Sequence, residues 1–216
     1  YPNLIRGLVH WSLIRIRSFR PMPKSHFDTS KGASYFFTVS LLNRHSDLLI
    51  REIDSLRASY ISALRTRPFI CDAFVVLPDH LHAVWTLPSG DNDVSTRWQV
   101  LKAQFTSRIR QGSAPSLNKT RGRPMGLWRH LYREHKIRDE TDFAACVERC
   151  WTNPVTHWLA TSPREWPYSS LHRDIRRGVV PPDWSGGGVI TKGQGATDGR
   201  KTTFSDKYAA SRLEYR

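Results

Sequence analysis

Apolar and polar side chains follow strand-like patterns in three short segments. Residues 33–42 (ASYFFTVSLL) are rich in aromatic and β-branched side chains, which is typical of a strand. Residues 71–78 (CDAFVVLP) and 82–88 (HAVWTLP) are apolar at successive positions, so both faces of each strand would be buried. We therefore expect these two segments to be neighbouring central strands of one sheet, on either side of the short element at residues 79–81.

Three further segments have the spacing of amphipathic helices. Apolar residues recur every three or four positions over residues 48–64, with Asp47 as the expected cap and Pro68 as the stop. Residues 94–109 show the same period with a basic outer face, and a third helix begins near Thr141 with acids at its positive end. This mixture of elements predicts an α+β fold, an antiparallel sheet with helices packed on one face.

The length of 216 residues allows one compact domain, which we assign to residues 22–184. Residues 1–21 contain arginines and no acidic side chain, so we interpret them as a basic extension, with a transit sequence as the alternative. Residues 185–216 are rich in Gly, Thr and Lys and predict a flexible tail. The apolar runs are far shorter than the roughly 20 residues that a bilayer span needs. Three cysteines without a CxxC pair argue against a disulfide scaffold or a structural zinc site and suit a reducing cytoplasm.

Charge is the strongest compositional signal. Lys and Arg number 33 against 19 Asp and Glu, which gives a formal net charge of +14. This excess attracts polyanions, so nucleic acid is the first expected partner and an acidic membrane surface the second; a generically basic protein is the plain alternative. The cations expected to contact DNA are Lys102, Arg108, Lys119, Arg121, Arg123, Arg173, Arg176 and Arg177.

Two histidines in the segment PDHLHAVW are the first candidates for chemistry. Side chains alternate between the two faces of a strand, so His80 and His82 project to the same side while Leu81 turns to the other. Two imidazoles on one side can share a metal ion, and a hard cation would need oxygen or amide ligands to complete its coordination. A pair of structural or solvent-facing histidines is the alternative.

Six segments together resemble a known family. They are SYFFTVSLLNR, DAFVVLPDHLHAVWTLPSGD, STRWQVLKAQFTSRI, GLWRHLYREHKIRD, NPVTHW and WPYSSLHRDIRRG, spread over residues 31–184. The chain resembles the single-tyrosine HUH transposases, and among them the REP-associated tyrosine transposases. The resemblance implies a ferredoxin-like or RRM-like endonuclease fold and a bacterial protein of the cytoplasm and nucleoid. It also implies single-stranded or hairpin DNA as the partner, with no membrane; the oligomeric state stays open between monomer and homodimer.

The resemblance also implies the ligands of a metal site. His80 and His82 would be the HUH pair that holds Mg²⁺ or Mn²⁺ against the scissile phosphate, and Asn153 in NPVTHW would supply the amide ligand. The family's nucleophile is a tyrosine one helical turn before this amide, and Arg149 occupies that position here. An arginine stays protonated and offers no lone pair for attack on a phosphodiester.

Three explanations of Arg149 stay open. The chain could have kept the fold and DNA binding and lost cleavage, with Arg149 as a phosphate clamp. Another hydroxyl could have replaced the nucleophile, with Tyr132 as the first candidate and Tyr168 as the second. A different alignment, or a deliberately introduced substitution, is the third. We expect metal-dependent cleavage and rejoining of single-stranded DNA at hairpin repeats, impaired at the nicking step; a non-catalytic hairpin-binding protein is the alternative, and an RNA-binding module is a weaker one.

Overall fold

A four-stranded antiparallel sheet forms the centre of the molecule, with strand order β2-β3-β1-β4. The computed structural model describes residues 32–112 and 126–187. The strands are β1 (Ser34–Ser40), β2 (Ile70–Val76), β3 (His80–Thr86) and β4 (Arg133–Lys136). The expected extension at residues 1–21, the cations Lys119, Arg121 and Arg123, and nearly all of the expected tail at 185–216 lie outside the described residues.

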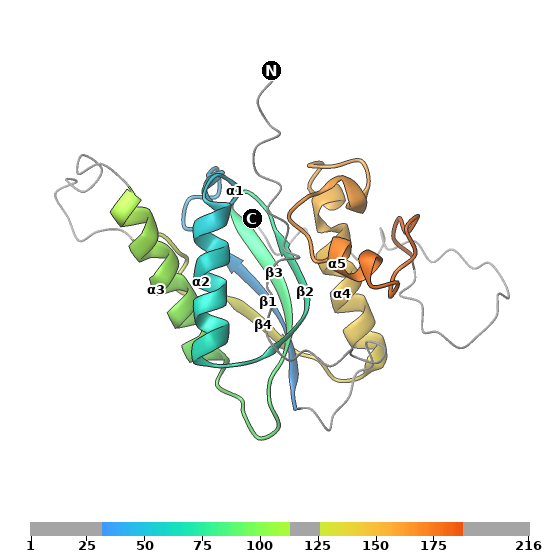
Figure 1. The fold of residues 1–216 in the computed structure, drawn as a ribbon, viewed down its shortest axis with the longest axis horizontal. Coiled ribbons are helices and arrows are strands. Elements are labelled where there is room, and N and C mark those ends of the chain that lie inside the picture. The colour runs from blue at the N-terminus through green and yellow to red at the C-terminus, as the bar shows by residue number, and fades with distance from the viewer. Residues whose placement is uncertain (1–31, 113–125, 188–216) are drawn as a thin grey trace, which may run out of the picture.

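Helices cover both faces of this sheet, which corrects the expectation of helices on one face (Figure 1). One face packs against α2 and α3, and the other packs against α4 and α5. The helical elements are α1 (Leu48–Arg51), α2 (Ile53–Thr66), α3 (Val94–Gly112), α4 (Glu140–Thr156), the short 3₁₀ helix η4 (Pro163–Glu165) and α5 (Leu171–Arg176). Phe36 and Phe37 are both buried although they point to opposite faces, so each face needs its own cover.

The face under α2 and α3 is filled by aromatic side chains. The ring of Trp85 on β3 stacks on Trp98 of α3, with centroids 4.1 Å apart, and Phe37 lies tilted against Trp85 at 5.2 Å. All three side chains are almost completely buried. Contacts of this kind add to the free energy gained by burying apolar area, so this cluster fixes α3 on the sheet.

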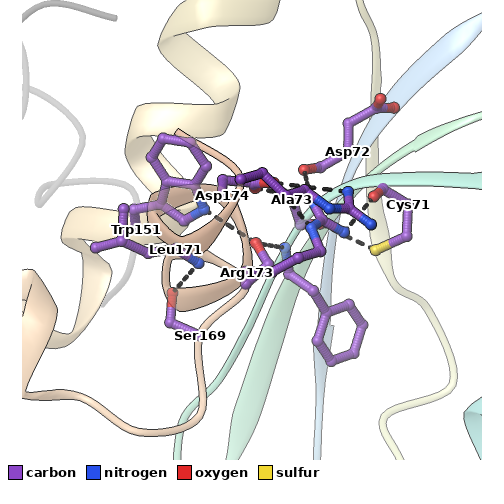
Figure 2. Close-up of polar contacts among 11 residues, drawn as sticks. Cys71, Asp72, Ala73, Trp151, Ser169, Leu171, Arg173 and Asp174 are labelled. Atoms are coloured by element: carbon purple, nitrogen blue, oxygen red, sulfur yellow. Dashed lines mark hydrogen bonds and ion pairs between the residues drawn. The ribbon is translucent and has the colours of Figure 1, made fainter. Parts of the chain in front are cut away.

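Strand β2 is an edge strand and not a central one as its apolar pattern predicted. Both of its faces are apolar because helices cover both sides of the sheet. Its outer edge is covered by the segment around residues 168–173 (Figure 2). The N–H of Val76 donates to Tyr168 O at 2.9 Å, and the N–H of Ser170 donates to Phe74 O at 2.8 Å. A covered edge cannot pair with another chain.

Arg173 completes this cover. Its guanidinium donates to the carbonyl oxygens of Cys71 and Asp72 at 2.8 and 2.7 Å and forms an ion pair with Asp174 at 2.8 Å (Figure 2). The sequence predicted Arg173 as a DNA contact; in the structure its donors bind the backbone of β2 and the Asp174 carboxylate.

The helix starts were predicted in part. The helix expected near Thr141 begins at Glu140, and Asp139 caps it, because its side chain accepts from the N–H of Asp142 at 2.9 Å. The expected helix after Asp47 is broken at Glu52 into α1 and α2, and Asp47 makes no side-chain cap bond. Its carboxylate pairs with Arg51 instead. Within the described residues, the helices are too short or too polar to cross a membrane.

Candidate nucleic-acid and metal site

His80 and His82 lie at the start of β3 and point to the face covered by α4, so the predicted alternation is confirmed. The residues that share their face, such as Val84 on β3 and Phe36 on β1, pack in the cluster formed by α4 and α5. Both histidines are buried, and their ring centroids are 5.2 Å apart. They follow directly on the turn at Pro78 and Asp79, where the N–H of Leu77 donates to His80 O at 2.8 Å.

Each imidazole uses its Nδ1 atom for a bond inside the protein. His80 Nδ1 lies 2.8 Å from Asp79 Oδ1, and His82 Nδ1 lies 2.9 Å from Thr38 Oγ1. These bonds fix the ring orientations, so the Nε2 atoms are the candidate metal-binding nitrogens. A carboxylate behind a ligating histidine is the usual supporting arrangement in metal sites.

Asp79 is itself held by Arg44, whose Nε lies 2.8 Å from Asp79 Oδ2. Burial alone would raise the pKa of Asp79, but the hydrogen bond from His80 and the charges of His80 and Arg44 outweigh it, so the pKa lies below its usual value. The carboxylate is therefore ionised at neutral pH and can keep its bond to His80.

Arg149 and Asn153 of α4 and its C-terminal cap His157 follow one another at a spacing of four residues, and Arg149 and His157 lie near the histidines. The imidazole of His157 lies 5.0 Å from that of His80, centroid to centroid. The guanidinium carbon of Arg149 lies 5.0 Å over the ring of Phe36, which in turn stacks at 5.3 Å on His82. Since residues four apart share one face of a helix, Asn153 is turned to the same side.

Asn153 is buried, and its Oδ1 makes no hydrogen bond to any residue that the structure describes. A buried carbonyl oxygen without a partner costs free energy unless something else binds it. An amide oxygen and imidazole nitrogens are ligand types that a divalent cation accepts.

His82 is also in the protonation state that a metal requires. Burial lowers the pKa of His82 well below its usual value, and the neighbouring His80, Arg149 and His157 lower it further. Burial and His80 likewise lower the pKa of His157. His82 is therefore neutral at pH 7, with a lone pair available for an ion.

A pocket of about 250 Å³ opens beside His80 and His157. Arg44, Ser46, His80, His157 and Leu159 contribute to its walls. Its polar lining includes the cation Arg44, and its size suits a phosphate group with part of a sugar. Such a pocket could place a phosphodiester against His80.

A second group on the same face could also hold a metal ion: His135 of β4 with Asp142 and Cys146 of α4. His135 Nε2 lies 2.8 Å from Asp142 Oδ2, and the Cys146 thiol donates to Asp142 Oδ1 at 3.8 Å. Burial and the nearby Asp142 raise the pKa of Cys146 to about 12, so an ion would have to displace the thiol proton.

Tyr132 and Tyr168, the two candidates for a substitute nucleophile, lie away from the histidines. The ring of Tyr132 packs edge-on against Phe37 at 6.0 Å, and its hydroxyl lies 3.2 Å from Ser95 Oγ. Tyr168 packs against the same cluster under α2 and α3. Both side chains therefore contact the face of the sheet opposite to His80.

The cations predicted to bind DNA that the structure describes lie on different elements. Lys102 and Arg108 belong to α3 on the face opposite to the histidines, and Lys102 Nζ donates to Arg129 O at 3.3 Å. Arg176 and Arg177 are exposed on and after α5. Two cations that the sequence did not single out, Arg44 and Arg133, lie near the site. Arg44 lines the pocket, and Arg133 lies opposite Thr38 on the neighbouring strand and on the same face of the sheet.

The sequence interpretation missed Arg44, Thr38 and His157 as parts of the site. For His157 a signal existed, because it follows Asn153 by four residues in NPVTHW. Thr38 and Arg44 are far from the histidines in sequence, and only the pairing of β1 with β3 brings them close.

No protein-family model matches the chain. A curated relative from Escherichia coli (strain K12), named REP-associated tyrosine transposase, is 42% identical over 156 residues, which make up 72% of this chain and 87% of that protein. A relative from Haemophilus influenzae with the same family designation is 36% identical over 160 residues, 74% of this chain and 91% of that protein. A solved structure of a REP-associated tyrosine transposase bound to a REP hairpin matches with a TM-score of 0.64 and 36% identity, and covers 83% of this chain and 100% of that one.

Proposed function

Because the chain belongs to the family of REP-associated tyrosine transposases, we propose that it binds hairpin DNA with an unpaired flank and holds a divalent cation between His80, His82 and Asn153. A hairpin-DNA partner implies that the protein acts on the DNA of the nucleoid, in the cytoplasm of a bacterium. The proposal includes a second part: with Arg149 at the position of the attacking residue, the protein grips the DNA phosphate without forming a covalent bond to it.

The observation that supports the cation site is the buried Asn153 Oδ1, which has no hydrogen-bond partner among the described residues and lies one helical turn before His157, the residue whose ring contacts His80. Mg²⁺ and Mn²⁺ both accept carbonyl oxygen, and Mn²⁺ also accepts imidazole nitrogen. When bound, the ion would polarise a phosphoryl oxygen of the DNA. His80 and His82 would bind it through Nε2, while Asp79 and Thr38 hold the two rings in place.

The position of Arg149 is the observation that supports the loss of cleavage. Its guanidinium lies over Phe36 and close enough to His82 to lower the pKa of that imidazole. A planar guanidinium can donate two parallel hydrogen bonds to a phosphate, which an attacking tyrosine cannot. The same phosphate that a tyrosine would attack is therefore bound and left intact.

The test uses a labelled REP hairpin with an unpaired flank and the full chain in the presence of Mn²⁺. Binding is followed by fluorescence anisotropy between 50 and 300 mM salt, values on the order of those over which phosphate contacts weaken. We expect affinity to fall with salt with a log–log slope of about −0.7 for each single-strand phosphate contacted. A flat response would refute DNA binding.

The same mixture is then run on a denaturing gel. We expect no protein–DNA adduct and an intact DNA strand. An adduct that maps to any tyrosine would refute the loss of cleavage, while leaving hairpin binding in place. A scrambled strand of equal length and composition, without a hairpin, serves as the matched control and should bind more weakly.

A further inference from the structure

Trp158 has an unusual backbone and an unusual exposure. Its φ angle is +59°, and it is the sole residue other than glycine with positive φ in the described part of the chain. Its side chain is 90% exposed, more than the other large apolar side chains of the same ranges, of which Leu131 follows at 82%. An L-residue with a bulky side chain rarely adopts this conformation.

The conformation comes from the way α4 ends. The N–H of Trp158 donates to Val155 O at 3.0 Å, and the N–H of Leu159 donates to Pro154 O at 2.9 Å. This pair of bonds is a Schellman motif, whose left-handed position is usually glycine or asparagine. A tryptophan there is strained, and its exposed ring gains almost nothing from burial, so folding alone gives no reason for it.

The position of Trp158 supplies a reason. It stands in the chain between His157 and Leu159, which both line the pocket beside His80. Arg44 lines the same pocket. A DNA phosphate bound beside Arg44 would therefore bring the adjoining sugar and base to the C-terminal end of α4. Strained residues that the surrounding structure holds in place are often found at binding sites.

We propose that Trp158 is a stacking platform for one unpaired nucleobase of the DNA whose phosphate occupies the pocket beside His80. The inference rests on the proposed function and deepens it. An exposed indole offers a flat face to any base, and this contact is tolerant of sequence. A protein partner fits less well, because the exposed apolar surface here amounts to Trp158 with part of Leu159, in a chain of net charge +14.

The experiment compares wild type with W158G and W158F on two DNA probes, a hairpin with an unpaired flank and the same hairpin with a blunt end. W158G is expected to weaken binding of the flanked hairpin by about fivefold to 150-fold, the effect of removing one base–aromatic stack. It should leave the blunt hairpin unchanged, and W158F should retain most of the affinity. The matched control L131A, which removes another exposed apolar side chain, should bind both probes as wild type does.

Glycine accepts positive φ without strain, so W158G also separates binding from folding. Its melting temperature should be at or above the wild-type value, which shows that weaker binding does not come from a damaged fold. The fluorescent base 2-aminopurine is placed at one flank position after another. Its fluorescence should be quenched at one of these positions with wild type and at none with W158G. Such quenching identifies the stacked base directly.

The outcomes distinguish the two proposals. If wild type binds the flanked hairpin and W158G binds it equally well, the stacking role is refuted and hairpin binding stands. If wild type binds neither probe, the proposed function fails and the stacking role with it. If W158G alters the sedimentation of the protein without DNA and leaves DNA affinity unchanged, Trp158 belongs to a protein interface and the inference is refuted.

Discussion

The imidazole of His157 lies edge-on to that of His80, with ring centroids 5.0 Å apart and ring planes at 67°. This contact joins the C-terminal end of α4 to the first residue of β3. His80 is thus held from two sides, by the His157 ring and by the Asp79 carboxylate at its Nδ1 atom. The position of its Nε2 atom depends on both contacts.

Replacing Asp79 tests this support. We expect Asp79→Asn to lower the affinity for Mn²⁺ by about 10- to 100-fold, because the charged acceptor that orients His80 is lost. Affinity is measured by the electron paramagnetic resonance signal of free Mn²⁺. Asp47→Asn is the control, since Asp47 lines the same pocket but its carboxylate is 70% exposed and pairs with Arg51. Equal affinities for the two variants would contradict a metal at His80.

Replacing Arg149 by tyrosine tests the position of the missing nucleophile. Residue 149 lies over Phe36 and within electrostatic reach of His82, so a phenol there would stand beside the bound phosphate. We expect Arg149→Tyr to form a protein–DNA adduct with the flanked hairpin and Mn²⁺, detected on a denaturing gel. Arg149→Phe places a ring without a hydroxyl and should form none. Absence of an adduct with Arg149→Tyr, while the DNA still binds, would mean that residue 149 is not at the reacting phosphate.

The parts of the site that sequence predicts are those set by local rules. The alternation of side chains along a strand placed His80 and His82 on one side, and the helix period placed Asn153 one turn from Arg149. The acids at the start of α4 follow a local rule too, because Glu140 and Asp142 lie in its first turn.

The parts that sequence missed depend on pairing between distant segments. Tyr132 looked close to the site in sequence, yet the register of β4 puts Arg133 and His135 on the histidine face and leaves Tyr132 on the other. Strand β2 looked central because both of its faces are apolar, and a segment almost a hundred residues later in the chain covers its edge. Periodicity cannot show which distant segment covers an edge.

The cover of β2 gives a stability prediction. Arg173→Ala removes the donors to Cys71 O and Asp72 O and leaves Asp174 without its closest cation. Loss of one partner of a largely buried ion pair costs about 3–5 kcal/mol, and we expect the lower end because the Arg173 side chain is 23% exposed. Urea denaturation measures the free energy of unfolding. The exposed neighbour Arg176→Ala should change it by less than about 0.5 kcal/mol. Equal stabilities would contradict the structural role of Arg173.

The ion pair between Asp91 and Arg97 gives a prediction of pH dependence. Arg97 is 1% exposed and donates to Asp91 at 2.7 Å, and its hydrogen bonds lower the pKa of Asp91 from 3.8 to about 2. Because the folded state holds the carboxylate ionised more strongly than the unfolded state does, this pair stabilises the fold fully above about pH 4, and its contribution is lost as the pH falls toward 2. Asp91→Asn cannot titrate and should be less stable than wild type at pH 7. The difference between the two urea midpoints should stay constant from pH 7 to about pH 5 and shrink steadily below pH 4. At pH 2.5, on the order of half a pH unit above the pKa of Asp91 in the folded protein, much of the difference should be lost. If the difference between the urea midpoints stays constant down to this pH, Arg97 does not stabilise the ionised form of Asp91.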